Sequence, residues 1–144
     1  REAMPMIRYR TRDITTLRRV RCECGRTLIK MDKVYGRSDD MLIISGVNVF
    51  PSQIESLLLD IPEIEPQYVI ILRKKGYLDQ LHVDVEAKRE TYEGGPQKIA
   101  EVEKKVEAKI RGIIGLGVRI RLVPPKAITR SEGKAKRVID ERKI

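Results

Sequence analysis

The sequence predicts an α+β fold in which two helices lie on one face of a small sheet. Apolar residues recur with helical spacing in two segments, 51–64 and 98–115. Strand-like runs alternate with these segments, so that from about residue 34 the order is strand, helix, strand, strand, helix, strand. This order is typical of a split βαβ arrangement.

The first 32 residues do not share this pattern, and we expect them to be the last segment of another domain. Apolar residues alternate with arginines in "MIRYRTRDIT", which indicates a strand. The following "DKVYGRSDD" combines glycine, serine and paired aspartates, which favours a turn or linker. We therefore predict two units, residues 1–35 and residues 36–144.

A buried strand and the first helix open the second unit. "MLIISG" reads as a buried strand that ends at Gly46. In the helix that follows, Ser52 and Glu55 have the spacing of a capping box, and Pro62 is expected to end it. The predicted core face of this helix comprises Ile54, Leu57, Leu58 and Ile61.

Two strands, a helix and a last strand complete the predicted fold. "QYVIILRK" and "LDQLHVDVEAK" are joined by "KGY", and His82 falls on the polar face of the second strand as a satisfied or solvated surface side chain. "YEGGPQ" is expected to be a loop, "VRIRLV" a strand, and residues 126–144 a basic tail. The core face of the second helix is predicted to comprise Ile99, Val102, Val106, Ile110 and Ile113.

Charge and composition narrow the classes of partner. The net charge is +9, and the basic excess lies in residues 1–33 and 126–144, whereas the middle is nearly neutral. This favours an anionic partner near the ends over a uniformly basic nucleic-acid surface. Aromatic residues are only 4% and Trp is absent, so we expect an aliphatic core. No run of 18 apolar residues occurs, so we expect no membrane span. We expect a cytoplasmic protein that is a fragment of a longer chain.

The residues that could do chemistry are few. His82 is the only histidine, so the sequence offers no set of nucleophile, histidine and acid. Cys22 and Cys24 form a C-x-C pair, which is too close for a comfortable disulfide and supplies only two of four zinc ligands. They are either reduced thiols at a turn or half of a zinc site.

Three local features could bind an anionic nucleotide. Asp13, at the end of a strand, could accept hydrogen bonds from ribose hydroxyls, and Arg37 in the linker could reach a phosphate. Lys134 follows Gly133, so a flexible backbone could deliver its charge to a phosphate. Taken singly, each is more often a solvated surface residue, but their order along the chain is informative.

In this order the segments resemble the adenylate-forming acyl/aryl-CoA ligases, and in particular the phenylacetate-CoA ligase branch. The segments are "YRTRD" (9–13), "GRSDDMLIISGVNVFPSQIE" (36–55) and "ITRSEGKAKRVID" (128–140). "CECGRT" (22–27) is also similar to that branch. Arg12 stands where the wider superfamily usually has glycine, a departure that this branch tolerates.

The resemblance implies the end of a large N-terminal domain followed by a small mobile C-terminal domain. In this family a carboxylate attacks the ATP α-phosphate, and after a domain rotation the thiol of coenzyme A displaces AMP. Lys134 would then be the catalytic residue of adenylation, and Asp13 and Arg37 would bind ATP or AMP. Asp39 would be the hinge residue, within a hinge at 37–40.

The resemblance also implies a coenzyme A channel and a set of partners. Mg²⁺ would accompany ATP, with most of its ligands outside this chain. The partners would be an aryl or small organic acid, ATP, coenzyme A and the missing N-terminal domain, and homodimerisation stays open. The channel would comprise Ser45, Gly46 and Val47, with Lys136 and Arg137 near the coenzyme A phosphates.

Two alternatives remain. A synthetase of the same family could transfer AMP to a deazaflavin coenzyme, and the coenzyme A channel would then be unused. A nucleic-acid-binding module would suit the basic ends, but RNA-binding sheets of this topology present stacking aromatic residues. Here Phe50 is the only phenylalanine, and Tyr68 and Tyr77 are expected at strand edges.

Overall fold

The computed structural model describes residues 7–130 and 137–142, and its centre is a four-stranded mixed sheet. The strand order is β10-β7-β8-β9, with β7 antiparallel to β8 and the two outer strands parallel to their neighbours. These strands are β7 (Ile64–Lys75), β8 (Leu78–Ala87), β9 (Val118–Val123) and β10 (Val138–Asp140).

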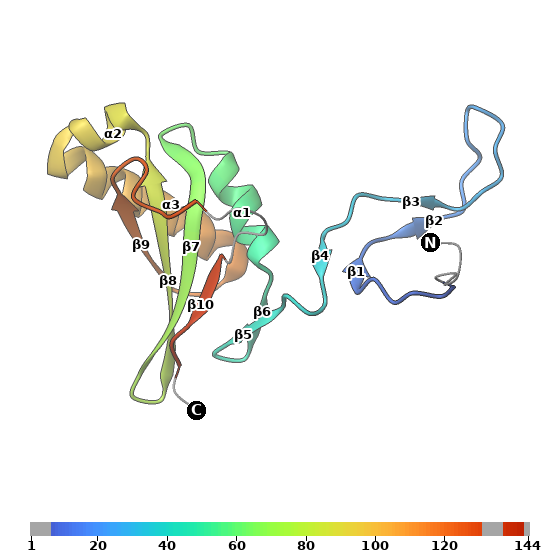
Figure 1. Ribbon diagram of the computed structural model, residues 1–144, viewed down its shortest axis with the longest axis horizontal. Helices are drawn as coiled ribbons and strands as arrows, with labels where there is room; N and C mark the ends of the chain where they lie inside the picture. Colours follow the sequence, from blue (N-terminus) through green and yellow to red (C-terminus); the bar gives the residue numbers. More distant parts are fainter. Residues whose placement is uncertain (1–6, 131–136, 143–144) are drawn as a thin grey trace.

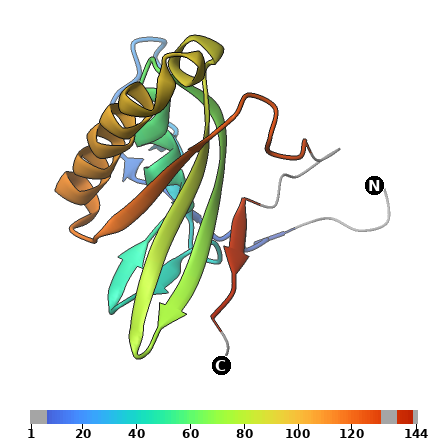
Figure 2. The ribbon, with the colours of Figure 1, turned by 90° about the vertical axis from the view of Figure 1, so that its left-hand side faces the viewer.

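The helices cover one face of this sheet (Figure 2). Alternation along β8 directs Leu81, Val83 and Val85 toward them, and all three side chains are buried. The helices are α1 (Pro51–Leu59), α2 (Arg89–Glu93) and α3 (Gly95–Ile114). The predicted α+β class with helices on one face is confirmed.

Residues 7–40 extend away from the sheet (Figure 1). They contain four two-residue strands that pair as β1 with β4 and β2 with β3. The next two strands, β5 and β6, form a separate hairpin. The bounds are β1 (Asp13–Ile14), β2 (Leu17–Arg18), β3 (Lys30–Met31), β4 (Gly36–Arg37), β5 (Leu42–Ile44) and β6 (Val47–Val49).

Two strands differ from the prediction. The run 41–46 does not join the main sheet, because Ser45 (φ 48°) and Gly46 (φ 81°) reverse the chain and β5 pairs with β6. The fourth strand of the sheet is instead β10, from the predicted tail, and it lies parallel to β7 with Ile139 opposite Ile71.

The predicted capping box at the first helix is wrong. Helix α1 begins after Phe50, whose N–H donates to the Gln53 side chain at 3.1 Å. The Ser52 hydroxyl donates instead to the Tyr35 carbonyl at 2.8 Å, which ties the helix start to the linker. Glu55 forms an ion pair with Arg137. The helix already ends at Leu59, before the predicted proline stop.

The second helix is longer than predicted and its buried face is narrower. The predicted loop 92–97 is largely helical, since α2 reaches Glu93 and α3 begins at Gly95. Val102, Val106 and Ile110 are buried as predicted. Ile113 is 63% exposed, which corrects its predicted core position.

This difference within one helix gives a stability prediction. Replacing Ile110 by alanine should lower the free energy of unfolding by about 2–5 kcal/mol, because the deletion leaves a cavity under the sheet. The matched substitution Ile113→Ala should change it by less than about 0.5 kcal/mol, because that side chain already contacts water. Urea unfolding followed by circular dichroism measures both. Equal losses in the two variants would contradict the assigned helix face.

Candidate functional site

The structure places Asp13 and Arg37 side by side. They are register partners in the β1–β4 ladder, although 24 positions separate them in the sequence. Both line a pocket of about 300 Å³ beside the start of α1, together with Tyr35, Phe50 and Ser52. The two residues predicted to bind the nucleotide therefore face one cavity.

A bidentate ion pair between Arg37 and Asp39, called the fork below, lies at the junction between residues 7–37 and the domain built on the four-stranded sheet. The Arg37 Nε and Nη2 atoms donate to the two Asp39 carboxylate oxygens at 3.0 and 2.9 Å. Arg12 Nη1 lies 3.8 Å from the same carboxylate, and the Ser38 N–H donates to the Arg12 carbonyl at 2.8 Å. The hydrogen bonds from Arg37 lower the pKa of Asp39, with Arg12 adding to the effect. The predicted hinge residue is thus held by a bidentate pair.

A second cavity, of about 560 Å³, also adjoins this junction and shares Ser52 with the first. It is lined by Asp39, Glu55, Tyr68 and Arg137, among others. The Arg137 guanidinium pairs with Glu55, donates to the Tyr68 hydroxyl at 3.1 Å and lies 4.8 Å from the centre of the Tyr68 ring. Burial raises the pKa of Tyr68. Arg137 contacts its own domain here, and its predicted role at a coenzyme A phosphate stays a prediction.

The predicted coenzyme A segment is the tight turn of the β5–β6 hairpin. The Ser45 N–H donates to the Asp79 carboxylate at 3.1 Å, and this bond is the main cause of the lowered pKa of Asp79. Asp79 also pairs with Arg142 at 3.2 Å. The positive φ of Gly46 requires glycine, and a side chain there would meet nothing within 4 Å. Val47 packs against the core. Asp79 therefore holds the turn through the Ser45 N–H, and Gly46 at its tip faces open space.

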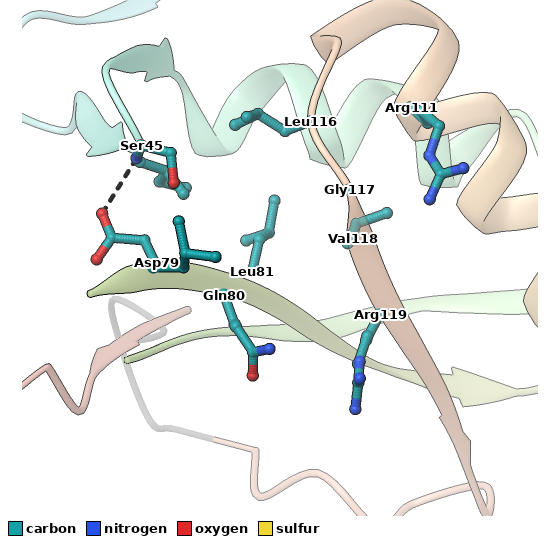
Figure 3. A pocket seen from close by; sticks show the side chains of 11 residues that line it. Ser45, Asp79, Gln80, Leu81, Arg111, Leu116, Gly117, Val118 and Arg119 are labelled. Atoms are coloured by element: carbon teal, nitrogen blue, oxygen red, sulfur yellow. Dashed lines mark hydrogen bonds between the residues drawn. The ribbon is translucent and has the colours of Figure 1, made fainter. Parts of the chain in front are cut away.

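A pocket of about 380 Å³ adjoins this turn (Figure 3). Ser45 and Asp79 form one wall, and Arg111 and Arg119 lie on the opposite side. The sequence did not indicate either arginine, because Arg111 lies in the last turn of an amphipathic helix and Arg119 alternates with apolar residues in a strand. Their joint approach to the Ser45–Gly46 turn depends on the packing of α3 beside β9. The pocket is basic on one wall and could hold an anionic group.

Lys134 and Lys136 lie outside the described residues. The flanking residues Arg130 and Arg137 are described, and each pairs with a glutamate of the sheet domain, Glu86 and Glu55 respectively. Arg130 and Arg137, the described residues on either side, are therefore both held to this domain.

The cysteines and the histidine contribute no closed site. The Cys24 thiol donates to Cys22 at 2.8 Å, and this bond lowers the pKa of Cys22. Across the described residues, no group of three or more His, Cys, Asp or Glu side chains could hold a metal ion. His82 is half-buried, and burial lowers its pKa, with help from Arg73 and Arg119.

Comparison with known proteins identifies the family of the chain. A family model described as the AMP-binding enzyme C-terminal domain matches residues 46–142. The chain is 42% identical to the phenylacetate-coenzyme A ligase of Escherichia coli (strain K12), over 100% of this chain and 32% of that protein. It is 40% identical to the phenylacetate-coenzyme A ligase of Thermus thermophilus, over 99% of this chain and 35% of that protein. The chain thus spans about a third of the length of these curated relatives.

A solved 2-hydroxyisobutyryl-CoA ligase superposes on the chain in two states. The postadenylation state gives a TM-score of 0.84 at 29% identity, covering 95% of this chain and 29% of that chain. The thioesterification state gives 0.69 at 29% identity, covering 96% and 29%. The fold is that of the C-terminal domain of adenylate-forming ligases. The chain belongs to the AMP-binding enzyme C-terminal domain family.

Over the part of the chain that the structure describes, none of the helices has the length and apolar character needed to cross a membrane.

The Arg37–Asp39 fork predicts a measurable titration. Asp39 should titrate below its ordinary pKa of 3.8, and Arg37→Gln should move the midpoint up toward that value. Because the folded-state pKa is depressed, the stabilisation by the fork is present above the ordinary pKa and is lost as pH falls through the folded-state value. Carboxyl-carbon NMR measures the midpoint. Arg18→Gln, which removes the separate Arg18–Asp32 pair, is the control and should leave Asp39 unchanged. An Asp39 midpoint that is equal in wild type and Arg37→Gln would contradict the fork.

Proposed function

We propose that this chain is the C-terminal portion of an ATP-dependent aryl-acid CoA ligase, with a phenylacetate-like substrate. Asp13 and Arg37 carry the proposal, because they meet at one cavity directly beside the Asp39 junction. Asp13 would accept hydrogen bonds from the ribose hydroxyls of AMP, and Arg37 would contact the ribose or a phosphate. The identity to phenylacetate-CoA ligases along the chain supports the substrate class.

Residues 1–35 would be the end of a large adenylation domain, and residues 36–144 the mobile domain. Apolar side chains gather unburied in the first part, as expected for a surface that another domain covers. They include Ile7, Tyr9, Leu17, Leu28, Met31 and Tyr35, each more than half exposed. The acid pocket would lie in that larger domain, so the isolated chain should be inactive.

The two steps of the proposed reaction would require different groups of the protein. In adenylation, Lys134 would place its charge between the acid carboxylate and the ATP phosphates, where negative charge develops. In thioester formation, the Ser45–Gly46 turn and Val47 would line the pantetheine channel, and Arg111 and Arg119 would attract the phosphates of coenzyme A. Lys136 and Arg137 are further candidates for these phosphates. ATP would bring Mg²⁺, and most ligands of the ion would lie outside this chain. The described residues include no group of three or more His, Cys, Asp or Glu that could hold it.

Asp39 would be the hinge between the two steps. Backbone rotation there would break the Arg37 fork and move the whole sheet domain. The 2-hydroxyisobutyryl-CoA ligase supports this, because it fits the chain better in its postadenylation state than in its thioesterification state at equal identity. The arrangement seen here would correspond to the adenylation side of the cycle.

The role of Lys134 in adenylation is tested by measuring the two half-reactions separately in the full-length ligase. Lys134→Ala should reduce acid-dependent pyrophosphate–ATP exchange by about 10²–10³-fold, the range expected for losing one charge-stabilising group. Thioester formation from synthetic acyl-adenylate should change little, because the lysine would have left the site. Lys75→Ala, at the exposed end of β7, is the matched control. Exchange that survives in Lys134→Ala would contradict the role, and a product carrying AMP instead of coenzyme A would favour the cofactor-adenylating synthetase.

The role of the pocket lined by Arg111 and Arg119 is tested by measuring the KM for coenzyme A. Arg111→Glu and Arg119→Glu should each raise the KM for coenzyme A about tenfold, the loss of one charged contact, and leave pyrophosphate exchange unchanged. Arg89→Glu, on the exposed surface of α2, is the control for added negative charge. An unchanged KM in both pocket variants would remove these arginines from the coenzyme A site.

A further inference from the structure

Arg142 joins three strands that are far apart in the sequence. Its Nη1 atom donates to the Ile43 carbonyl of β5 at 2.8 Å and to the Asp79 carboxylate of β8 at 3.2 Å. Its Nε and Nη2 atoms donate to the two carboxylate oxygens of Asp140, in β10, at 2.9 and 2.7 Å. The Arg142 side chain is only 22% exposed. These acceptors therefore replace much of the hydration that the guanidinium loses.

The backbone next to Arg142 is held in the four-stranded sheet. The Glu141 N–H donates to the Leu72 carbonyl at 2.9 Å and so continues the pairing of β10 with β7. Arg73 Nε donates to the Glu141 carboxylate at 2.8 Å. The guanidinium of Arg142 thus reaches β5 and β8 from a backbone that is itself hydrogen-bonded to the sheet.

Asp79 extends this connection to the turn of the β5–β6 hairpin. Its Oδ2 atom accepts from Arg142 Nη1 at 3.2 Å and from the Ser45 N–H at 3.1 Å, and Figure 3 shows the second bond. An isolated two-stranded hairpin is at best marginally stable, so the position of the turn depends on contacts with the rest of the domain. Buried Ile44 and Val49 hold one face of the hairpin, and Asp79 holds the turn.

We propose that Asp79 and Arg142 are positioning residues for the Ser45–Gly46 turn, required in thioester formation and dispensable in adenylation. They act by fixing the turn, and they need not bind coenzyme A themselves. This inference rests on the proposed function, in which the turn lines the pantetheine channel. A loss of stability alone would weaken both half-reactions equally, whereas a displaced turn should weaken only the step that uses the channel.

The first test is Asp79→Ala in the full-length ligase, because alanine removes the acceptor of both bonds. In thioester formation from synthetic acyl-adenylate, kcat/KM for coenzyme A should fall at least about tenfold, since a displacement of about 1 Å can cost about 10²-fold. Acid-dependent pyrophosphate–ATP exchange should stay within about twofold. Asp79→Asn keeps an oxygen that can accept from the Ser45 N–H, so it should retain more thioester formation than Asp79→Ala.

Arg142→Met tests the same connection from its other side, should Asp79→Ala fail to fold. Methionine is also long and unbranched, but it donates no hydrogen bond. We expect the same selective loss of thioester formation. In the double variant the loss should match that of the more affected single variant, because both residues act through one turn. Losses that multiply would overturn the shared role.

Asp84→Ala and Arg121→Met are the matched controls. Asp84 lies on the same strand as Asp79 and accepts from Arg121 Nε at 2.9 Å. The two aspartate side chains are similarly shielded, with 13% of Asp84 and 17% of Asp79 exposed. The control pair joins β8 to β9 and includes neither Asp79 nor Arg142, so both half-reactions should stay within about twofold.

Hydrogen exchange gives a readout that needs no activity. The Ser45 amide should exchange about fivefold faster in Asp79→Ala than in Asp84→Ala, the change expected for one lost hydrogen bond. Equal loss of both half-reactions, or undiminished thioester formation in Asp79→Ala and Arg142→Met, would overturn the inference. A wild-type ligase that forms no thioester with coenzyme A would refute the proposed function itself, and the inference with it.

Discussion

The antiparallel register of β7 and β8 is the constraint on which the rest of the structure depends. It pairs Tyr68 with Val85 and Leu72 with Leu81, and so directs one apolar face toward the helices. A slip of one residue would exchange the two faces of β8 and bury Asp84 in place of Val83 or Val85. The same register sets Glu86 on the opposite face, where the segment after β9 covers it.

The two steps of the proposed reaction would use different parts of this domain. The segments that flank Lys134 are fixed by Glu86 and Glu55, whereas the Ser45–Gly46 turn is fixed by Asp79 through Arg142 and the Ser45 N–H. In the proposed cycle, the junction at Asp39 would determine which part of the sheet domain faces the large domain, so selection between the steps would need no rearrangement of the sheet.

Elements with a regular pattern of apolar residues were predictable from the sequence. Both long helices follow from apolar spacing, and the β7–β8 hairpin follows from alternation around "KGY". The strand β10 was missed because only Val138 and Ile139 are apolar among charged neighbours, and its pairing with Ile70 and Ile71 is a long-range contact. The run "MLIISG" predicts a sheet strand, although it forms a hairpin strand, because a buried hairpin strand and a sheet strand share the same pattern.

The candidate site was predictable in part. Asp13 and Arg37 were proposed from local features and Asp39 from the resemblance to the ligase family. The structure places the three close together, and their roles stay predictions. Arg111 and Arg119 were missed because their approach to Ser45 depends on the tertiary packing of a helix end beside a strand. Glu86 was missed because an acidic residue on the polar face of a strand is ordinarily solvated, and only the returning chain buries it.

The most direct test of the account is a distance between the two parts of the chain during the reaction. Spin labels at Thr16 and at Lys104 on α3 would report it by pulsed electron paramagnetic resonance in the full-length ligase. The account predicts one distance population with ATP and acid, and a second when coenzyme A is added to a stable acyl-adenylate analogue. The second should be lost in Asp39→Pro, because proline restricts the backbone torsion at the junction. A single unchanged population under all conditions would contradict the proposed domain rotation.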